Sequence, residues 1–124
     1  MGFHMADSNK FEIHRKKENE IECLMLKGYL DAHTAPDLES AFESLLKENK
    51  NKIVVGFYDL DYISSAGLGV FMAFIEDVRN KGGDIKLANM QPKVYSVFDL
   101  LGFPLLFEIY DNENDAIEKF LSKN

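Results

Sequence analysis

Hydrophobic and polar positions follow two different periods along the chain, and each period predicts one type of element. Residues 11–18 alternate weakly between apolar and polar side chains, which is typical of an edge strand. Residues 21–30 are apolar at nearly every position and predict a strand buried on both faces. Residues 52–60 are β-branched and aromatic and predict a third strand. Shorter apolar runs predict the last two strands, 84–90 and 105–111.

Four other segments repeat apolar residues at i, i+3, i+4 and i+7, the spacing of one helix face. The first should begin at an N-cap Thr34 with Pro36 in its first turn. The second follows paired serines and should end at 82–83, and the third runs from Pro92 to Gly102. The predicted inward faces are Leu38, Ala41, Phe42 and Leu45; Leu68, Phe71, Met72, Ile75 and Val78; Val94, Val97, Phe98 and Leu101; and Ala116, Ile117, Phe120 and Leu121.

Together these elements have the order β-β-α-β-α-β-α-β-α, which predicts an α/β fold. Strands that alternate with helices favour a largely parallel sheet, to which the first two strands add an antiparallel pair. We expect a mixed sheet of four or five strands flanked by helices, with the third strand leading directly into a helix near Ser64 or Ser65. We interpret residues 1–8 as a disordered leader or expression scar and residues 9–124 as one domain.

The charge and composition of the chain disfavour some classes of partner and favour one cellular compartment. Fourteen basic and twenty-one acidic residues give a formal net charge of −7, which disfavours binding to nucleic acid. No apolar run approaches the ~18 residues of a membrane span, and the N-terminus lacks a signal-peptide layout. We therefore expect a cytoplasmic protein without membrane insertion. The single cysteine, Cys23, lies among strand-like apolar residues and is interpreted as a buried, inert thiol.

The residue constellations of common enzymes are absent from this sequence. Residues 64–69 are not followed by the Gly-Lys-Ser/Thr of a phosphate-binding loop, and Ile63 replaces the first glycine of a nucleophile elbow. The three histidines share no metal-ligand spacing, so we expect neither a metal nor another cofactor. A serine hydrolase that uses Ser65, His33 and Asp31 is a remote alternative.

Two adjacent serines stand where the third strand gives way to a helix. A helix N-terminus presents unpaired N–H groups and a partial positive charge, so it can hold a phosphate on Ser64 or Ser65. Gly67 and Gly69 would leave room beside the backbone for a bulky group. The local sequence alone favours a simpler interpretation, in which Ser64 is only the N-cap and Ser65 only a first-turn residue.

The helix after the serines also carries apolar residues on its predicted outer side. Val70 and Ala73 should point outward, and Phe74 should lie at the edge of the buried face. Outward apolar side chains indicate either a docking face or a helix that a neighbouring element covers.

Two motifs resemble those of the STAS domain, a family named for sulfate transporters and anti-sigma factor antagonists. Residues 27–38, KGYLDAHTAPDL, are similar to the family's G-x-L-D-x-x-T-A-x-x-L, and residues 62–71, YISSAGLGVF, are similar to [YF]-[IM]-D-S-[SA]-G-L-G. The late segment 100–120 agrees as well, so the resemblance covers residues 11–122 and is greatest for small bacterial antagonists. Both motifs follow strand ends, which predicts that Asp31 lies near the serines.

The resemblance implies partner switching. The unphosphorylated protein would bind an anti-sigma factor that is also a serine kinase, and so release a sigma factor. Phosphorylation by that kinase would switch the antagonist off, and a PP2C-type phosphatase would restore it. The motif's serine corresponds to Ser65, with Ser64 as the rival acceptor. The implied partner-binding residues are Asp31, Thr34, Ser64, Ser65, Ala66, Gly67, Gly69, Val70 and Ala73.

The sequence departs from the family pattern at four positions. Ser64 replaces the motif's aspartate, Ala66 stands where some members have a second serine, Gly56 replaces a third-strand aspartate, and Tyr29 replaces a frequent glutamate. Our interpretation is an anti-sigma factor antagonist. The alternative is a STAS subunit of a lipid-transport or signalling complex, which would keep the docking helix without being phosphorylated.

Overall fold

The computed structural model describes residues 10–122, so the interpretation of residues 1–8 lies outside the described residues. Its five strands form one sheet in the order β1-β2-β3-β4-β5. β1 runs antiparallel to β2, and the pairs β2–β3, β3–β4 and β4–β5 are parallel. The strands are β1 Glu12–Glu18, β2 Ile21–Leu30, β3 Lys52–Ile63, β4 Asp84–Ala88 and β5 Ile109–Tyr110. The predicted mixed α/β sheet is confirmed.

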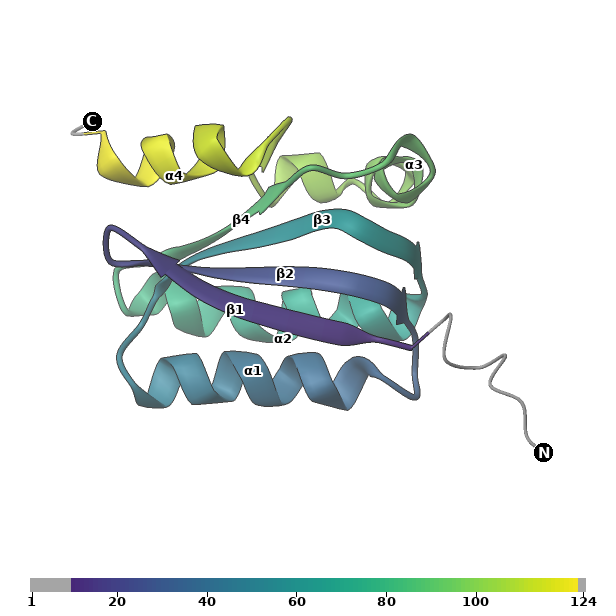
Figure 1. Ribbon diagram of the computed structural model, residues 1–124, viewed down its shortest axis with the longest axis horizontal. Coiled ribbons are helices and arrows are strands. Elements are labelled where there is room, and N and C mark those ends of the chain that lie inside the picture. The colour runs from purple at the N-terminus through teal and green to yellow at the C-terminus, as the bar shows by residue number, and fades with distance from the viewer. Residues whose placement is uncertain (1–9, 123–124) are drawn as a thin grey trace.

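In the described part of the chain, four α-helices flank this sheet, and they alternate with the strands as the sequence predicts. Figure 1 shows α1 and α2 side by side on one face, with α4 on the other. The helices are α1 Ala35–Lys47, α2 Ser65–Asn80, α3 Pro92–Leu100 and α4 Glu113–Leu121. β3 runs into α2 with only Ser64 between them, which confirms the predicted direct transition.

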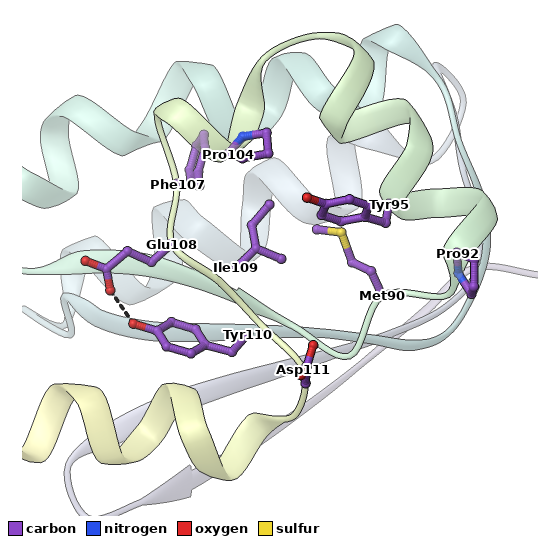
Figure 2. Close-up of a pocket in the computed structure, with 9 residues that line it drawn as sticks. All are labelled: Met90, Pro92, Tyr95, Pro104, Phe107, Glu108, Ile109, Tyr110 and Asp111. Carbon is purple, nitrogen blue, oxygen red and sulfur yellow. Dashed lines mark hydrogen bonds between the residues drawn. The ribbon is translucent and has the colours of Figure 1, made fainter.

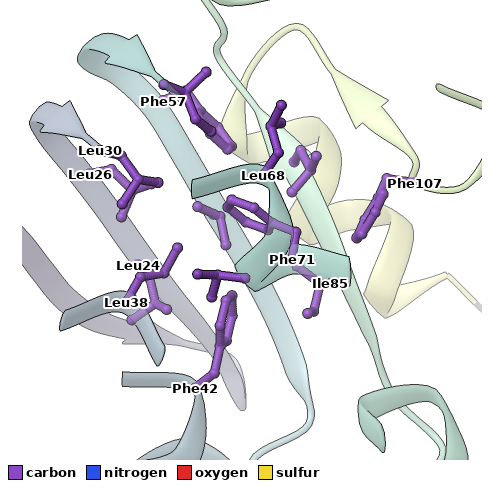
Figure 3. Close-up of a cluster of buried hydrophobic side chains, with 14 of the residues drawn as sticks. Leu24, Leu26, Leu30, Leu38, Phe42, Phe57, Leu68, Phe71, Ile85 and Phe107 are labelled. Carbon is purple, nitrogen blue, oxygen red and sulfur yellow. The ribbon is translucent and has the colours of Figure 1, made fainter. Parts of the chain in front are cut away.

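The main core lies between the sheet and the helices α1, α2 and α3, and leucines and phenylalanines make up most of it (Figure 3). Phe71 of α2 packs against Phe42 of α1 and Phe57 of β3, with ring centroids 5.8 Å apart in both pairs. Phe98 of α3 completes this cluster at 5.4 Å from Phe57. A smaller cluster under α4 contains Cys23, which is fully buried; burial raises the pKa of its thiol, as expected for an inert cysteine.

The C-terminal third differs from the sequence prediction. We expected a strand over 105–111, but β5 has only two residues, Ile109–Tyr110. Gly102 adopts a left-handed φ of +78° after α3, and Phe103–Leu105 then form a 3₁₀ turn that leads the chain away from the sheet. Leu101, predicted to face inward, consequently lies beyond the end of α3 and is 56% exposed.

Two other inward predictions are also wrong, because each residue lies at the margin of its helix's buried stripe. Met72 of α2 is 46% exposed, and Leu121 at the last turn of α4 is also exposed. Gly56, by contrast, has a packing role in β3. A Cβ atom there would lie 2.6 Å from both the Glu113 carboxylate and the Met25 methyl group. Glycine thus leaves the space that the first residue of α4 fills.

Candidate functional site

The two sequence motifs meet at the carboxyl ends of β2 and β3. Leu30 pairs with Ile63 in the parallel register, and the Ser64 amide donates a hydrogen bond to the Leu30 carbonyl oxygen at 2.9 Å. The loop that begins at Asp31 and the turn that contains Ser65 are therefore neighbours, as the position of both motifs after strand ends predicted. We call the surface that they form, residues 29–34 and 62–66, the switch surface.

Asp31 organises its own loop. Its carboxylate accepts hydrogen bonds from the amides of His33 (3.0 Å) and Thr34 (3.1 Å), and its carbonyl oxygen accepts one from the Ala35 amide (2.7 Å). Thr34 stands at the N-cap of α1 as predicted, yet its side chain does not cap the helix. Instead, its hydroxyl accepts from the Asp31 amide and donates to the Tyr29 carbonyl oxygen, both at 2.9 Å. These two residues give the loop a defined shape.

The contacts of Asp31 also test the alternative of a serine hydrolase that uses Ser65, His33 and Asp31. A catalytic triad requires an acid that orients a histidine and a histidine that reaches the serine. Here the Asp31 carboxylate is held by the backbone amides of its own loop. Within residues 10–122, the exposed His33 imidazole makes no hydrogen bond to Asp31 or Ser65, so the required relay is not assembled.

The paired serines have different environments. Ser64 is the N-cap of α2: its backbone is extended, and its hydroxyl oxygen accepts from the Gly67 amide at 3.4 Å, as predicted. Ser65 is the first residue of the helix, and its side chain is exposed. The capping function thus belongs to Ser64, and the Ser65 hydroxyl lies in solvent beside the positive end of the helix.

The two glycines of the motif also differ. A Cβ atom on Gly69 would meet no heavy atom within 4 Å, so this position does leave open space above the helix. On Gly67 it would lie 2.8 Å from Leu30 Cγ and 3.1 Å from the Leu30 carbonyl oxygen. The expectation that Gly67 makes room for an approaching group is therefore wrong. Its missing side chain lets α2 pack against the end of β2.

The predicted outward position of Val70 is also wrong, because Val70 is only 2% exposed. One turn further along the helix, Phe74 packs on Phe42 of α1 with ring centroids 5.4 Å apart. Val70 and the half-buried Ala66 lie on this same side of α2, so the neighbouring helix widens the buried stripe. The exposed side of α2 instead carries Ser65, Gly69, Met72, Ala73 and Glu76.

A tyrosine pair beside these loops was not identified from the sequence. Tyr29 and Tyr62 are in register on β2 and β3, with ring centroids 5.5 Å apart, and they are 37% and 47% exposed. The available signal was alternation, because each tyrosine immediately precedes a buried residue, Leu30 or Ile63. A hollow of about 140 Å³ adjoins Tyr62, between the end of β3 and the first turn of α3.

A larger cavity of about 720 Å³ lies between α3 and β5, and none of its lining residues belongs to the two motifs (Figure 2). Met90, Tyr95 and Ile109 form part of its apolar wall. On the other side of the strand, the Tyr110 hydroxyl donates a hydrogen bond to Glu108. Burial and this hydrogen bond raise the pKa of Tyr110 well above its ordinary value.

Within 10–122, no group of three or more histidine, cysteine, aspartate or glutamate side chains is arranged to hold a metal ion. In the same part of the chain, no helix has both the length and the apolar character needed to cross a membrane.

Comparison with known proteins agrees with the fold and the motifs. The family model described as "STAS domain" matches residues 12–116. The chain is 26% identical to the anti-sigma F factor antagonist of Paenibacillus polymyxa, over 86% of this chain and 92% of that protein. It is 28% identical to the anti-sigma-B factor antagonist of Bacillus subtilis, over 84% and 94%.

Among solved structures, a crystal structure of a Thermotoga maritima protein superposes with a TM-score of 0.81 at 26% sequence identity. That match covers 86% of this chain and 92% of the other. Because the family model spans most of the chain, from β1 into α4, we conclude that this protein belongs to the STAS domain family.

Proposed function

We propose that this protein is an anti-sigma factor antagonist that works by partner switching and is controlled at Ser65. In its unphosphorylated form it binds a serine-kinase anti-sigma factor through the switch surface and the exposed side of α2. Phosphorylation of Ser65 weakens this complex, and a PP2C-type phosphatase restores binding. The observation that carries the proposal is the exposed Ser65 hydroxyl at the N-terminus of α2, next to a serine that already caps the helix.

The local geometry supports Ser65 as the acceptor over Ser64. The Ser64 oxygen holds the Gly67 amide and its residue is half-buried, so a kinase would have to open the cap before it could transfer phosphate. Ser65 takes no part in the cap and is exposed. A phosphate on it, carrying about −1.5 to −2 charges at pH 7, would lie next to the helix's positive end, so the fold tolerates it.

The effect of the phosphate therefore falls on binding. A dianion at the centre of an interface must lose its water when the partner docks, and an unpaired charge buried in this way costs about 2–5 kcal/mol. That penalty corresponds to a loss of affinity of more than tenfold. The size of the matched relatives supports the same role, since this chain covers 92% and 94% of the two named antagonists.

A phosphorylation assay with the kinase-type anti-sigma factor of the same cell tests the proposal. The wild type, Ser64→Ala and Ser65→Ala are incubated with the kinase and ATP, and the modified residue is mapped by mass spectrometry. We expect labelling of wild type and Ser64→Ala but none of Ser65→Ala, and at least tenfold weaker binding of the phosphorylated product. Undiminished labelling of Ser65→Ala would move the site to Ser64. A kinase that binds the wild type without labelling it would favour the unphosphorylated complex subunit.

A further inference from the structure

The tyrosine pair Tyr29–Tyr62 is an unusual feature of the sheet surface. The two rings contact each other at a centroid distance of 5.5 Å, and both remain substantially exposed. Aromatic rings that are held rigidly and half-exposed are typical anchors of protein interfaces, because they bury a large area with few rotatable bonds.

Both tyrosines belong to the switch surface, at the ends of β2 and β3. The Tyr29 carbonyl oxygen accepts a hydrogen bond from the Thr34 hydroxyl, which fixes this strand end to the Asp31 loop. Tyr62 precedes Ser65 by three residues, and three residues of chain span at most about 11 Å. A standard interface covers ~800 Å² on each partner, a patch roughly 30 Å across. A partner centred on Ser65 can therefore cover both rings.

Beside Tyr62, the hollow of about 140 Å³ offers space for one inserted side chain. Val94 and Val97 of α3 supply an apolar wall. Its rim carries the ion pair between Lys93 Nζ and Asp61 Oδ1, which are 3.7 Å apart. Asp31 and Asp59 lie close to Tyr29 and Tyr62 in the chain and add two carboxylates, and Lys27 adds one cation. Around the two tyrosines, the acidic side chains therefore outnumber the basic ones.

We infer that Tyr29, Tyr62 and the adjoining hollow form the specificity-determining anchor for the anti-sigma factor, and that they take an aliphatic side chain flanked by basic residues. This inference rests on the proposed function and names the chemistry of its partner. The aliphatic group packs on the two rings and enters the hollow, while the basic neighbours face the surrounding carboxylates. Ser65 phosphorylation then controls whether the complex forms, and the tyrosine anchor selects which anti-sigma factor binds.

The test is a binding titration of the purified chain against the kinase-type anti-sigma factor of the same cell, by isothermal calorimetry. We expect Tyr29→Ala and Tyr62→Ala each to weaken binding at least tenfold, and the Tyr→Phe changes to alter it less than threefold. Tyr29→Glu, which replaces the ring with a carboxylate at an exposed position, should weaken binding as much as Tyr29→Ala. Tyr58→Ala is the matched control, because Tyr58 is 67% exposed on β3 but outside the pair.

The outcomes separate the inference from the proposed function. Circular dichroism and thermal unfolding verify that every variant is folded before its affinity is compared. If Ser65→Asp weakens binding while all Tyr29 and Tyr62 variants bind as the wild type does, the anchor is overturned and the switch remains. An equal loss in Tyr58→Ala would also overturn the anchor, since the pair would then have no special role. If the wild type does not bind the anti-sigma factor, both proposals are overturned.

Discussion

The Ser64 amide donates a hydrogen bond to the Leu30 carbonyl oxygen at 2.9 Å, and this bond joins the two sequence motifs at one edge of the sheet. Gly67 packs against the same residue from the first turn of α2. The Asp31 loop and the start of α2 are consequently placed by a shared strand end. A change in packing at Leu30 will therefore affect both parts of the switch surface.

The packing of α2 on β2 predicts that Gly67→Ala destabilises the fold. The added methyl group would lie 2.8 Å from Leu30 Cγ and 3.1 Å from its carbonyl oxygen, closer than normal contact. Overpacking of this kind lowers the free energy of unfolding by about 1–3 kcal/mol. Urea denaturation measures the loss. Gly69→Ala is the control, since its methyl group meets open space and should leave stability unchanged or raise it by up to ~1 kcal/mol.

The different environments of the serines predict different effects on stability. Ser64→Ala removes the N-cap acceptor of the Gly67 amide, so the free energy of unfolding should fall by about 0.5–2 kcal/mol. Because the bond is long, at 3.4 Å, we expect a value in the lower half of that range. Ser65→Ala should change stability by less than ~0.5 kcal/mol. A larger loss in Ser65→Ala than in Ser64→Ala would contradict the assignment of the cap.

Thr34→Val tests the hydrogen bonds that shape the Asp31 loop. Valine has nearly the shape of threonine but neither accepts from the Asp31 amide nor donates to the Tyr29 carbonyl oxygen. The partly buried Asp31 amide loses its partner, while the exposed Tyr29 carbonyl oxygen can bind water instead, so the free energy of unfolding should fall by about 0.5–1.5 kcal/mol. Hydrogen exchange of the Asp31 amide should accelerate in parallel. Ser96→Ala, which removes one exposed side-chain hydrogen bond within α3, provides the comparison and should have little effect.

A pH-dependent contribution to stability is expected from Glu108. Hydrogen bonds from Lys86 first, and then from Tyr110, lower the pKa of its carboxyl group. A carboxyl group whose pKa is lower in the folded than in the unfolded state stabilises the fold at pH values above its unfolded pKa of about 4.3. This stabilisation is lost as the pH falls through the folded pKa. Wild type should therefore be more stable than Glu108→Gln at pH 7, and the difference in melting temperature should shrink below about pH 4.

Glu43→Gln is the control for this experiment, because Glu43 is exposed and its replacement removes the same charge. The difference in melting temperature between Glu43→Gln and wild type should vary less with pH than that of Glu108→Gln. Only Glu108 of these two neutralises the largely buried Lys86, whose Nζ lies 2.8 Å from the Glu108 carboxylate. A Glu108→Gln difference that is constant from pH 7 to pH 3 would show that this ion pair does not contribute to acid stability.

Local sequence determined the element order, the strand over residues 21–30 and the boundaries around Ser64, because hydrophobic period, capping residues and glycines act over a few neighbouring positions. The same local signals failed at Val70 and at residues 105–108. Val70 is buried because α1 lies beside α2, which a single-helix pattern does not contain. The apolar run after Gly102 begins as a 3₁₀ turn that leads the chain away from the sheet, because Gly102 adopts a left-handed φ of +78°, so apolar character alone does not define a strand.

The candidate site was likewise predicted only in part from the sequence. The two motifs, with Asp31, Ser64 and Ser65, were recognisable from residue type and spacing, because each follows a strand that the pattern itself defines. Only the tertiary structure decided that Gly67 serves packing rather than access, since that depends on the distance to Leu30 in another strand. It also brought Tyr29 and Tyr62, 33 residues apart in the chain, into contact, because that contact depends on the register between β2 and β3.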